Sequence, residues 1–167
     1  MVMCTANRGR SPLAEAILRR KLGDRGLAHV HVESAGICAY ELGRAGLGAD
    51  PRVAKVALRH GLDLSQHYAR PFDANRFNEF DLIVVMEEWQ AEVLCSAFRP
   101  REGTIFTLRQ LGGEGDDPDT PDTAGVPLDA IEAYFEEAER CLEAALGSGP
   151  LATLLAGFTR PASEETA

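Results

Sequence analysis

A cysteine, a short loop and the start of a helix follow one another near the beginning of this chain, and this run restricts the fold more than any other feature. Residues 4–11 read Cys-Thr-Ala-Asn-Arg-Gly-Arg-Ser, and Pro12 then opens a helical run that extends to about residue 22. Proline suits the first turn of a helix. Unpaired backbone N–H groups and the positive helix end point the same way at such a place, and together they bind anions. The run therefore predicts an anion-binding loop that leads into a helix.

The residue types in this loop suit phosphoryl chemistry. A thiol at the Cys4 position is expected to exist largely as the thiolate, which is the nucleophilic form. The planar guanidinium of Arg10 can donate two parallel hydrogen bonds to two phosphate oxygens. Asn7 tolerates left-handed backbone, and Gly9 permits a tight turn. Nucleophile, anion cradle and guanidinium thus fall within one short stretch, which predicts phosphoryl transfer to the cysteine.

Composition narrows the class of protein. The 167 residues predict one domain, and a hydrophobic content of 45% provides for a real core. The net charge of −9 disfavours nonspecific binding to nucleic acid or to an anionic membrane. A bound phosphate then needs local cations, for which Arg8, Arg10 and Arg44 are candidates. The four cysteines are scattered, without a zinc or secreted-disulfide spacing, and we expect reduced thiols in the cytoplasm. We find no signal peptide before Cys4 and no apolar run of membrane-spanning length.

Strand and helix patterns alternate along the chain. We expect strands at 30–34, 80–86 and 104–106, and helices at 52–60, 88–98 and 128–145. The acidic stretch 112–126, rich in Gly, Pro and Thr, is expected to be a loop. Such alternation predicts an α/β fold with a parallel sheet covered on both faces, and ligands bind such sheets at the carboxyl ends of the strands.

Several motifs in this order resemble the low-molecular-weight protein tyrosine phosphatases. This family also includes protein-arginine phosphatases and is related to thioredoxin-coupled arsenate reductases. The resemblance runs from Met3 to about Leu146 and rests on residues 4–15, 34–36, 50–52, 64–70 and 80–86. It implies a three-layer α/β/α domain over residues 1–146, with a four-stranded parallel sheet of order 2-1-3-4. Residues 147–167 are then expected to form a flexible C-terminal extension, mobile or loosely docked.

The first strand departs from the family pattern. Only Met1, Val2 and Met3 precede Cys4, where the family has several more apolar residues. Either the true start lies upstream, or the strand is truncated. A truncated central strand loses core burial and backbone pairing, so we expect low stability for a chain that begins at Met1.

The resemblance assigns roles around the loop. Cys4 is expected to attack phosphorus and form a cysteinyl-phosphate, with no metal or cofactor. The phosphate would be held by Thr5, Ala6, Asn7, Arg8, Gly9 and Arg10. In the family, the positions of Asn7, Ser11, Ser34 and His67 form a hydrogen-bond network that fixes the loop. From the residues alone, the Ser11 hydroxyl either contacts the thiolate or caps the helix. We interpret His29, His31 and His60 as structural histidines.

Leaving-group protonation needs a carboxylic acid on the acidic loop. Two alignments compete: Asp117 keeps the family's Asp-Pro dipeptide, whereas Asp122 keeps the spacing to the last helix and the following glycine. We choose Asp122, because the distance to a rigid helix determines where the side chain points. Asp119 stays a further alternative to Asp122. Thr123 stands where the family usually has proline.

Specificity is less well determined by the sequence. Tyr40 falls where the family places an aromatic wall, which would stack on a phosphotyrosine ring. Arg8 matches neither the threonine of arginine phosphatases nor the apolar residue of tyrosine phosphatases. We therefore expect hydrolysis of protein phosphotyrosine, with protein phosphoarginine as an alternative and a non-catalytic phosphate-binding module as another. Arsenate reduction is disfavoured, because Cys95 lacks a partner cysteine for disulfide relay. The expected partner is a phosphorylated protein, together with an unidentified kinase, and not a nucleic acid or a membrane.

Overall fold

A computed structural model describes residues 1–114 and 116–158. Its centre is a parallel sheet of four strands: β1 (Val2–Cys4), β2 (Ser34–Gly36), β3 (Ile83–Val85) and β4 (Ile105–Thr107). The strands lie in the order β2-β1-β3-β4, which confirms the predicted order. β1 is thus central, and its carboxyl end carries the cysteine loop.

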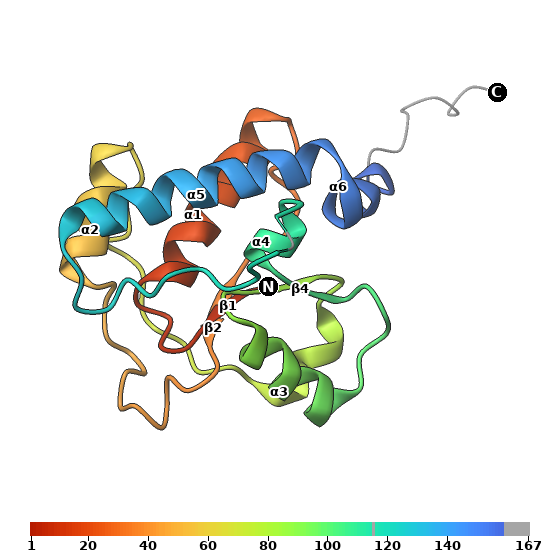
Figure 1. Ribbon diagram of the computed structural model, residues 1–167, viewed down its shortest axis with the longest axis horizontal. Helices are drawn as coiled ribbons and strands as arrows, with labels where there is room; N and C mark the ends of the chain where they lie inside the picture. Colours follow the sequence, from red (N-terminus) through yellow and green to blue (C-terminus); the bar gives the residue numbers. More distant parts are fainter. Residues whose placement is uncertain (115, 159–167) are drawn as a thin grey trace.

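Helices cover both faces of this sheet. Figure 1 shows α1 (Arg10–Asp24), α2 (Pro51–Arg59) and α5 (Leu128–Gly147) on one side and α3 (Glu88–Phe98) on the other. The side chains of β1 alternate between the two sides, as strand geometry requires. Val2 and Cys4 belong to the main core with residues of α1, α2 and α5, whereas Met3 packs in a second core with Phe77 and Leu94. The three-layer α/β/α architecture is therefore confirmed.

The start of α2 shows how the local sequence determines where a helix begins. The Asp50 side chain accepts a hydrogen bond from the Arg52 N–H and so caps α2, while Pro51 occupies its first turn. Val53, Val56 and Ala57 are its buried residues. Two shorter elements, η1 (Ala74–Glu79) and α4 (Leu108–Leu111), complete the connections to β3 and from β4.

β2 begins later than the sequence predicted. We expected a strand over residues 30–34 that ended at Ala35, but the strand comprises Ser34–Gly36. Its pairing with β1 begins at the Val2–Ser34 pair, and the Val2 N–H donates to the carbonyl of Glu33. Residues 30–32 lie before the first of these pairs and are not part of a strand.

Part of the expected flexible extension is a helix. Residues 149–156 form α6 (Gly149–Ala156), which lies against the end of α5. Leu151 and Leu155, one turn apart, are buried in the main core, and this burial holds α6 on the domain. The rest of the extension, residues 159–167, lies outside the described residues.

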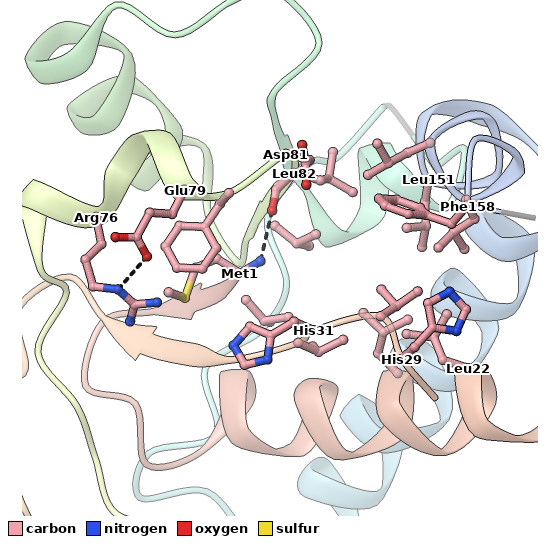
Figure 2. Close-up of a pocket in the computed structure, with 18 residues that line it drawn as sticks. Met1, Leu22, His29, His31, Arg76, Glu79, Asp81, Leu82, Leu151 and Phe158 are labelled. Carbon is pink, nitrogen blue, oxygen red and sulfur yellow. Dashed lines mark hydrogen bonds and ion pairs between the residues drawn. The ribbon is translucent and has the colours of Figure 1, made fainter. Parts of the chain in front are cut away.

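A cavity of about 340 Å³ lies at the amino end of β1. Figure 2 shows Met1 beside it, with the terminal nitrogen donating to the Leu82 carbonyl at 2.9 Å. Most of its lining is apolar and comes from α1, residues 29–32, residues 79–84 and the α6 region. β1 has three residues, as do the other strands. Within residues 1–114 and 116–158, no helix is long and apolar enough to cross a membrane.

Candidate active site

The cysteine loop occupies residues 4–10, between the end of β1 and the first turn of α1. Cys4 is buried, and the Asn7 N–H donates to its Sγ at 3.3 Å, so the loop folds back around the sulfur. Gly9 is the N-cap residue of α1 and provides no side-chain cap. The first N–H groups of a helix lack partners within it, so the start of α1 retains donors for an anion.

The Ser11 hydroxyl faces the sulfur and does not cap the helix. Its Oγ lies 3.0 Å from Cys4 Sγ and accepts a hydrogen bond from Asn7 Nδ2 at 2.9 Å. Of the two interpretations that the sequence left open, this geometry corresponds to contact with the nucleophile. Ser11 is fully buried, so water does not compete for this contact.

The four residues expected to form a supporting network lie together. Asn7 has a φ of 53°, in the left-handed region, and its Nδ2 also donates to Ser34 Oγ at 2.8 Å. Asn7 Oδ1 accepts from the Arg70 N–H at 2.9 Å. His67 Nε2 donates to the Asn7 carbonyl at 2.7 Å, and burial lowers the pKa of this imidazole. The backbone strain at Asn7 is thus balanced by hydrogen bonds on both its side chain and its carbonyl.

Glu15 completes this network from α1. Its buried carboxylate accepts a hydrogen bond from the Ser34 hydroxyl and pairs with Arg19 at 2.8 Å. Sequence reasoning included Glu15 in the motif but gave it no role. A signal was present, because an acidic residue one turn after Ser11 falls on the inner face of α1.

Arg10 is buried beside the sulfur and is held by groups from two other segments. Its guanidinium pairs with Glu87, donates to the Thr120 carbonyl at 3.1 Å, and approaches Asp122 Oδ1 with its Nε at 3.4 Å. Burial opposes the charge, but Cys4, Asp122 and Glu87 outweigh it and raise the pKa of Arg10. The guanidinium therefore stays charged and fixed in orientation.

Among the acidic-loop carboxylates considered, the geometry brings Asp122 to the site. It is 62% exposed and lines the same cavity as Cys4 and Arg10. Asp117 instead pairs with Arg109 at 2.6 Å, and Asp119 accepts from the Glu88 N–H at 2.6 Å. These two alternatives are thus engaged elsewhere.

Comparison with known proteins agrees with this geometry. The family model "Low molecular weight phosphotyrosine protein phosphatase" matches residues 1–151. The chain belongs to this family. The "Probable low molecular weight protein-tyrosine-phosphatase EpsP" of Ralstonia nicotianae is 34% identical over 144 residues, which cover 86% of this chain and 90% of that protein. A low molecular weight protein-tyrosine-phosphatase of Streptomyces coelicolor is 35% identical over 145 residues, 84% of this chain and 82% of that one.

A solved relative shares the fold. The structure of Vibrio vulnificus Wzb in complex with benzylphosphonate matches this phosphatase with a TM-score of 0.75 at 26% identity. The match covers 86% of this chain and 92% of that one. The predicted family membership is therefore confirmed by sequence and by fold.

The cavity of this phosphatase holds about 380 Å³ and has walls that differ in part from the prediction. Leu42 and Arg44 line it, but Tyr40, the expected aromatic wall, is 75% exposed and lies outside the lining. The Arg8 Nε donates to the Gly48 carbonyl at 2.7 Å, which joins the cysteine loop to the loop that follows β2. Arg8 therefore lies on the rim in a fixed position.

Glu87 is the site residue that sequence reasoning did not identify. It follows Met86 directly after β3, and its carboxylate both pairs with Arg10 and accepts from Trp89 Nε1 at 2.8 Å. Its position at the carboxyl edge of a strand beside β1 was a usable signal, because side chains there converge on the ligand site.

Proposed function

We propose that this protein hydrolyses phosphotyrosine on protein substrates through a cysteinyl-phosphate. The observation that carries the proposal is the meeting of Cys4, Arg10 and Asp122 in one cavity at the carboxyl end of β1. These three side chains provide a nucleophile, a phosphate clamp and an acid, which are the groups that a phosphatase without a metal requires.

In the first step, the Cys4 thiolate attacks phosphorus in line with the phenolic oxygen. The S–P bond forms as the P–O bond to the tyrosyl ring breaks, and protonated Asp122 gives its proton to the departing phenolate. Arg10 and the loop amides hold the three equatorial oxygens, whose charge is spread in the transition state. The contact with Ser11 stabilises the sulfur anion before attack and when it later leaves.

In the second step, water attacks the cysteinyl-phosphate. Asp122, now a carboxylate, accepts the proton of the water as the new P–O bond forms and the S–P bond breaks. Inorganic phosphate is released, and Cys4 returns to the thiolate. The proton that Asp122 takes from water reloads the acid for the next turnover, and its 62% exposure leaves the carboxyl accessible to both the leaving group and the water.

The rim supports phosphotyrosine over phosphoarginine. Arg8 and Arg44 line the cavity together with Asp50 and Asp122, so these charges balance and give no net attraction for a cationic guanidinium leaving group. The half-exposed Leu42 offers an apolar surface for a ring. The benzylphosphonate named in the Vibrio vulnificus Wzb structure carries an aromatic ring next to its phosphonate group, which is consistent with such a substrate.

We also propose a cytoplasmic location and an unidentified partner kinase. All four cysteines are unpaired thiols, and the mechanism needs Cys4 reduced, which a reducing compartment provides.

Steady-state kinetics on a phosphotyrosine peptide, a phosphoarginine peptide and 4-nitrophenyl phosphate test the proposal. We expect turnover of the first and third substrates, no turnover with Cys4→Ser, and a kcat about 10²- to 10⁴-fold lower for Asp122→Asn. Arg8→Thr should raise the rate on phosphoarginine relative to phosphotyrosine. A wild type that binds phosphate but never turns over would establish the non-catalytic alternative.

A further inference from the structure

Gly9 of the cysteine loop and Thr123 of the acidic loop are in direct contact. A Cβ placed on Gly9 would lie 2.2 Å from Thr123 Oγ1 and 3.5 Å from Thr123 Cβ. The first distance is far inside van der Waals contact, whereas the second is ordinary. Gly9 has φ −126° and ψ −91°, which lies outside both the α and β regions that other residues favour, although not in the left-handed region. Both the contact with Thr123 and this backbone conformation therefore disfavour a side chain at position 9.

We propose that Gly9 and Thr123 form a matched pair that seats the acidic loop against the cysteine loop, which makes Thr123 a positioning residue for Asp122. This inference rests on the proposed function, because it assigns Thr123 a part in delivering the general acid. The Thr123 side chain occupies the space that a side chain of residue 9 would fill.

The acidic loop is anchored at both ends, and Thr123 is the buried residue in its middle. At one end, the Thr120 N–H and Oγ donate to the Met86 carbonyl at 2.8 and 3.1 Å. At the other end, Arg52 Nη1 donates to the Val126 carbonyl at 3.0 Å. Within residues 121–125, Thr123 is buried with 3% exposure, and the other four residues are exposed. The central seat of this segment is therefore the Thr123 side chain.

The buried Thr123 side chain determines where Asp122 lies. Its carboxylate has two described contacts, with Arg10 Nε at 3.4 Å and with the Ala124 N–H at 3.3 Å. Both are long, and an exposed side chain gains little from such contacts. The adjacent buried residue therefore fixes the backbone from which Asp122 reaches the leaving group, and small displacements of a catalytic group lower rates strongly.

A double-mutant cycle tests the pair. Gly9→Ala introduces the clash and should lower kcat on a phosphotyrosine peptide about 10- to 100-fold, which is part of what a general acid contributes. Thr123→Ala removes the Oγ from this seat and should also lower kcat, but by less than Gly9→Ala, because no clash displaces the acidic loop. Gly9→Ala/Thr123→Ala should recover most of the activity of Thr123→Ala, because the remaining Cβ–Cβ contact is ordinary and only the cost of the backbone conformation at residue 9 is left. Gly9→Ala/Thr123→Val keeps the bulk without the hydroxyl and should stay impaired.

Leaving-group dependence separates positioning from general damage. In Gly9→Ala, the loss should be larger on phosphotyrosine than on 4-nitrophenyl phosphate, whose more acidic phenol needs less protonation. Inhibition by inorganic phosphate should change less than kcat, which would show that the loss arises mainly from the acid and not from phosphate binding by the cysteine loop. Gly23→Ala serves as the matched control, because a Cβ at Gly23 meets no atom within 4 Å.

Melting temperatures over the same cycle provide a readout that does not depend on turnover. Gly9→Ala should melt below wild type, and adding Thr123→Ala should recover most of the loss. A Gly9→Ala protein with wild-type kinetics and melting would overturn the inference, as would a double mutant as impaired as Gly9→Ala. If wild type and Cys4→Ser are equally inactive while the melting cycle shows the coupling, the proposed function fails and the seat remains, without a catalytic role.

Discussion

The two ends of β1 lie close together in sequence, but their polar groups differ in the hydrogen-bond and ionic partners that they have. At the carboxyl end, Cys4 and the loop after it meet serine, asparagine, arginine and carboxylate partners. At the amino end, the Met1 ammonium has one hydrogen bond, to the Leu82 carbonyl, beside a largely apolar cavity of about 340 Å³. No buried side-chain nitrogen or oxygen in the described residues lacks a partner, so the least compensated polar group of this strand is its terminus.

This difference indicates that activity and stability are located at opposite ends of one strand. Ligands of parallel α/β sheets bind at the carboxyl ends of strands, and the charged cavity around Cys4 lies there. The amino end lies beside a largely apolar cavity, which leaves unfilled space next to the core. Changes at the carboxyl end should therefore alter catalysis strongly, whereas changes at the amino end should alter melting and leave catalysis intact.

The largest effect is expected from Asn7→Ala at the carboxyl end. The substitution removes three side-chain hydrogen bonds and leaves an alanine in the left-handed region. We expect kcat/KM to fall about 100-fold and the free energy of unfolding to fall by about 2–4 kcal/mol. Steady-state kinetics and urea denaturation measure the two losses.

Two variants serve as controls for Asn7→Ala. Asn7→Gly removes the same hydrogen bonds without the left-handed penalty, and should be about 1 kcal/mol more stable than Asn7→Ala. Asn78→Ala, at an exposed position, should leave both quantities unchanged. A fully active Asn7→Ala would mean that the loop does not depend on this network.

The next largest effect is a change in melting temperature at the amino end of β1. Adding two or three residues with alternating valines before Met1 should extend β1 into the cavity and remove the buried ammonium. Each fully buried valine contributes about 1.5–3 kcal/mol, and each kcal/mol raises the Tm by about 2–4 °C in a protein of this size. A Gly-Ser extension of equal length removes the charge without filling the cavity, and should recover only part of the gain. An unchanged Tm with the valine extension would refute the assignment of low stability to this end.

The Met1 ammonium also predicts a pH dependence. Burial lowers its pKa from 8.0 to about 6. The unfolded chain then binds this proton between pH 6 and pH 8 and the folded chain does not, so stability is highest above pH 8 and falls as the pH drops to 6. The change is at most about 3 kcal/mol. Chemical denaturation at both pH values should show it for the present chain, and the difference should be smaller in the valine-extended chain, which retains His67.

The smallest effect is expected from an exposed charge at the rim of the active-site cavity. Arg44→Ala should raise KM for an acidic phosphotyrosine peptide about 1.5- to 5-fold, since exposed ion pairs contribute little. The effect should shrink at high salt and be absent with 4-nitrophenyl phosphate. A salt-independent change would indicate that Arg44 acts on the loop structure and not on the substrate charge.

Local motifs were the most predictable part of the molecule. Residues 4–11 carry their chemistry in consecutive positions, so the loop and the start of α1 followed from the sequence, and the strand order followed from the resemblance. The Asp122 choice rested on its spacing to α5, and Asp122 does line the cavity with Cys4.

Contacts between distant segments were not predictable in the same way. The pairing of Glu87 with Arg10 and the contact of Thr123 with Gly9 join residues that no sequence spacing relates. Tyr40 was assigned to the cavity by position in the family, but the loop carries its ring into solvent. Such features depend on how loops meet in space, which periodicity and local propensity do not determine.

The most direct test of the central claim is rapid-quench mass spectrometry of the protein mixed with a phosphotyrosine peptide. We predict a covalent phosphate on the peptide that contains Cys4. With 4-nitrophenyl phosphate, whose leaving group needs less protonation, this adduct should accumulate further in Asp122→Asn, in which the attack of water is slowed. Cys4→Ser should yield neither this adduct nor free phosphate. Release of phosphate by Cys4→Ser at the wild-type rate, or wild-type turnover with no phosphate on Cys4 at any time, would contradict the account.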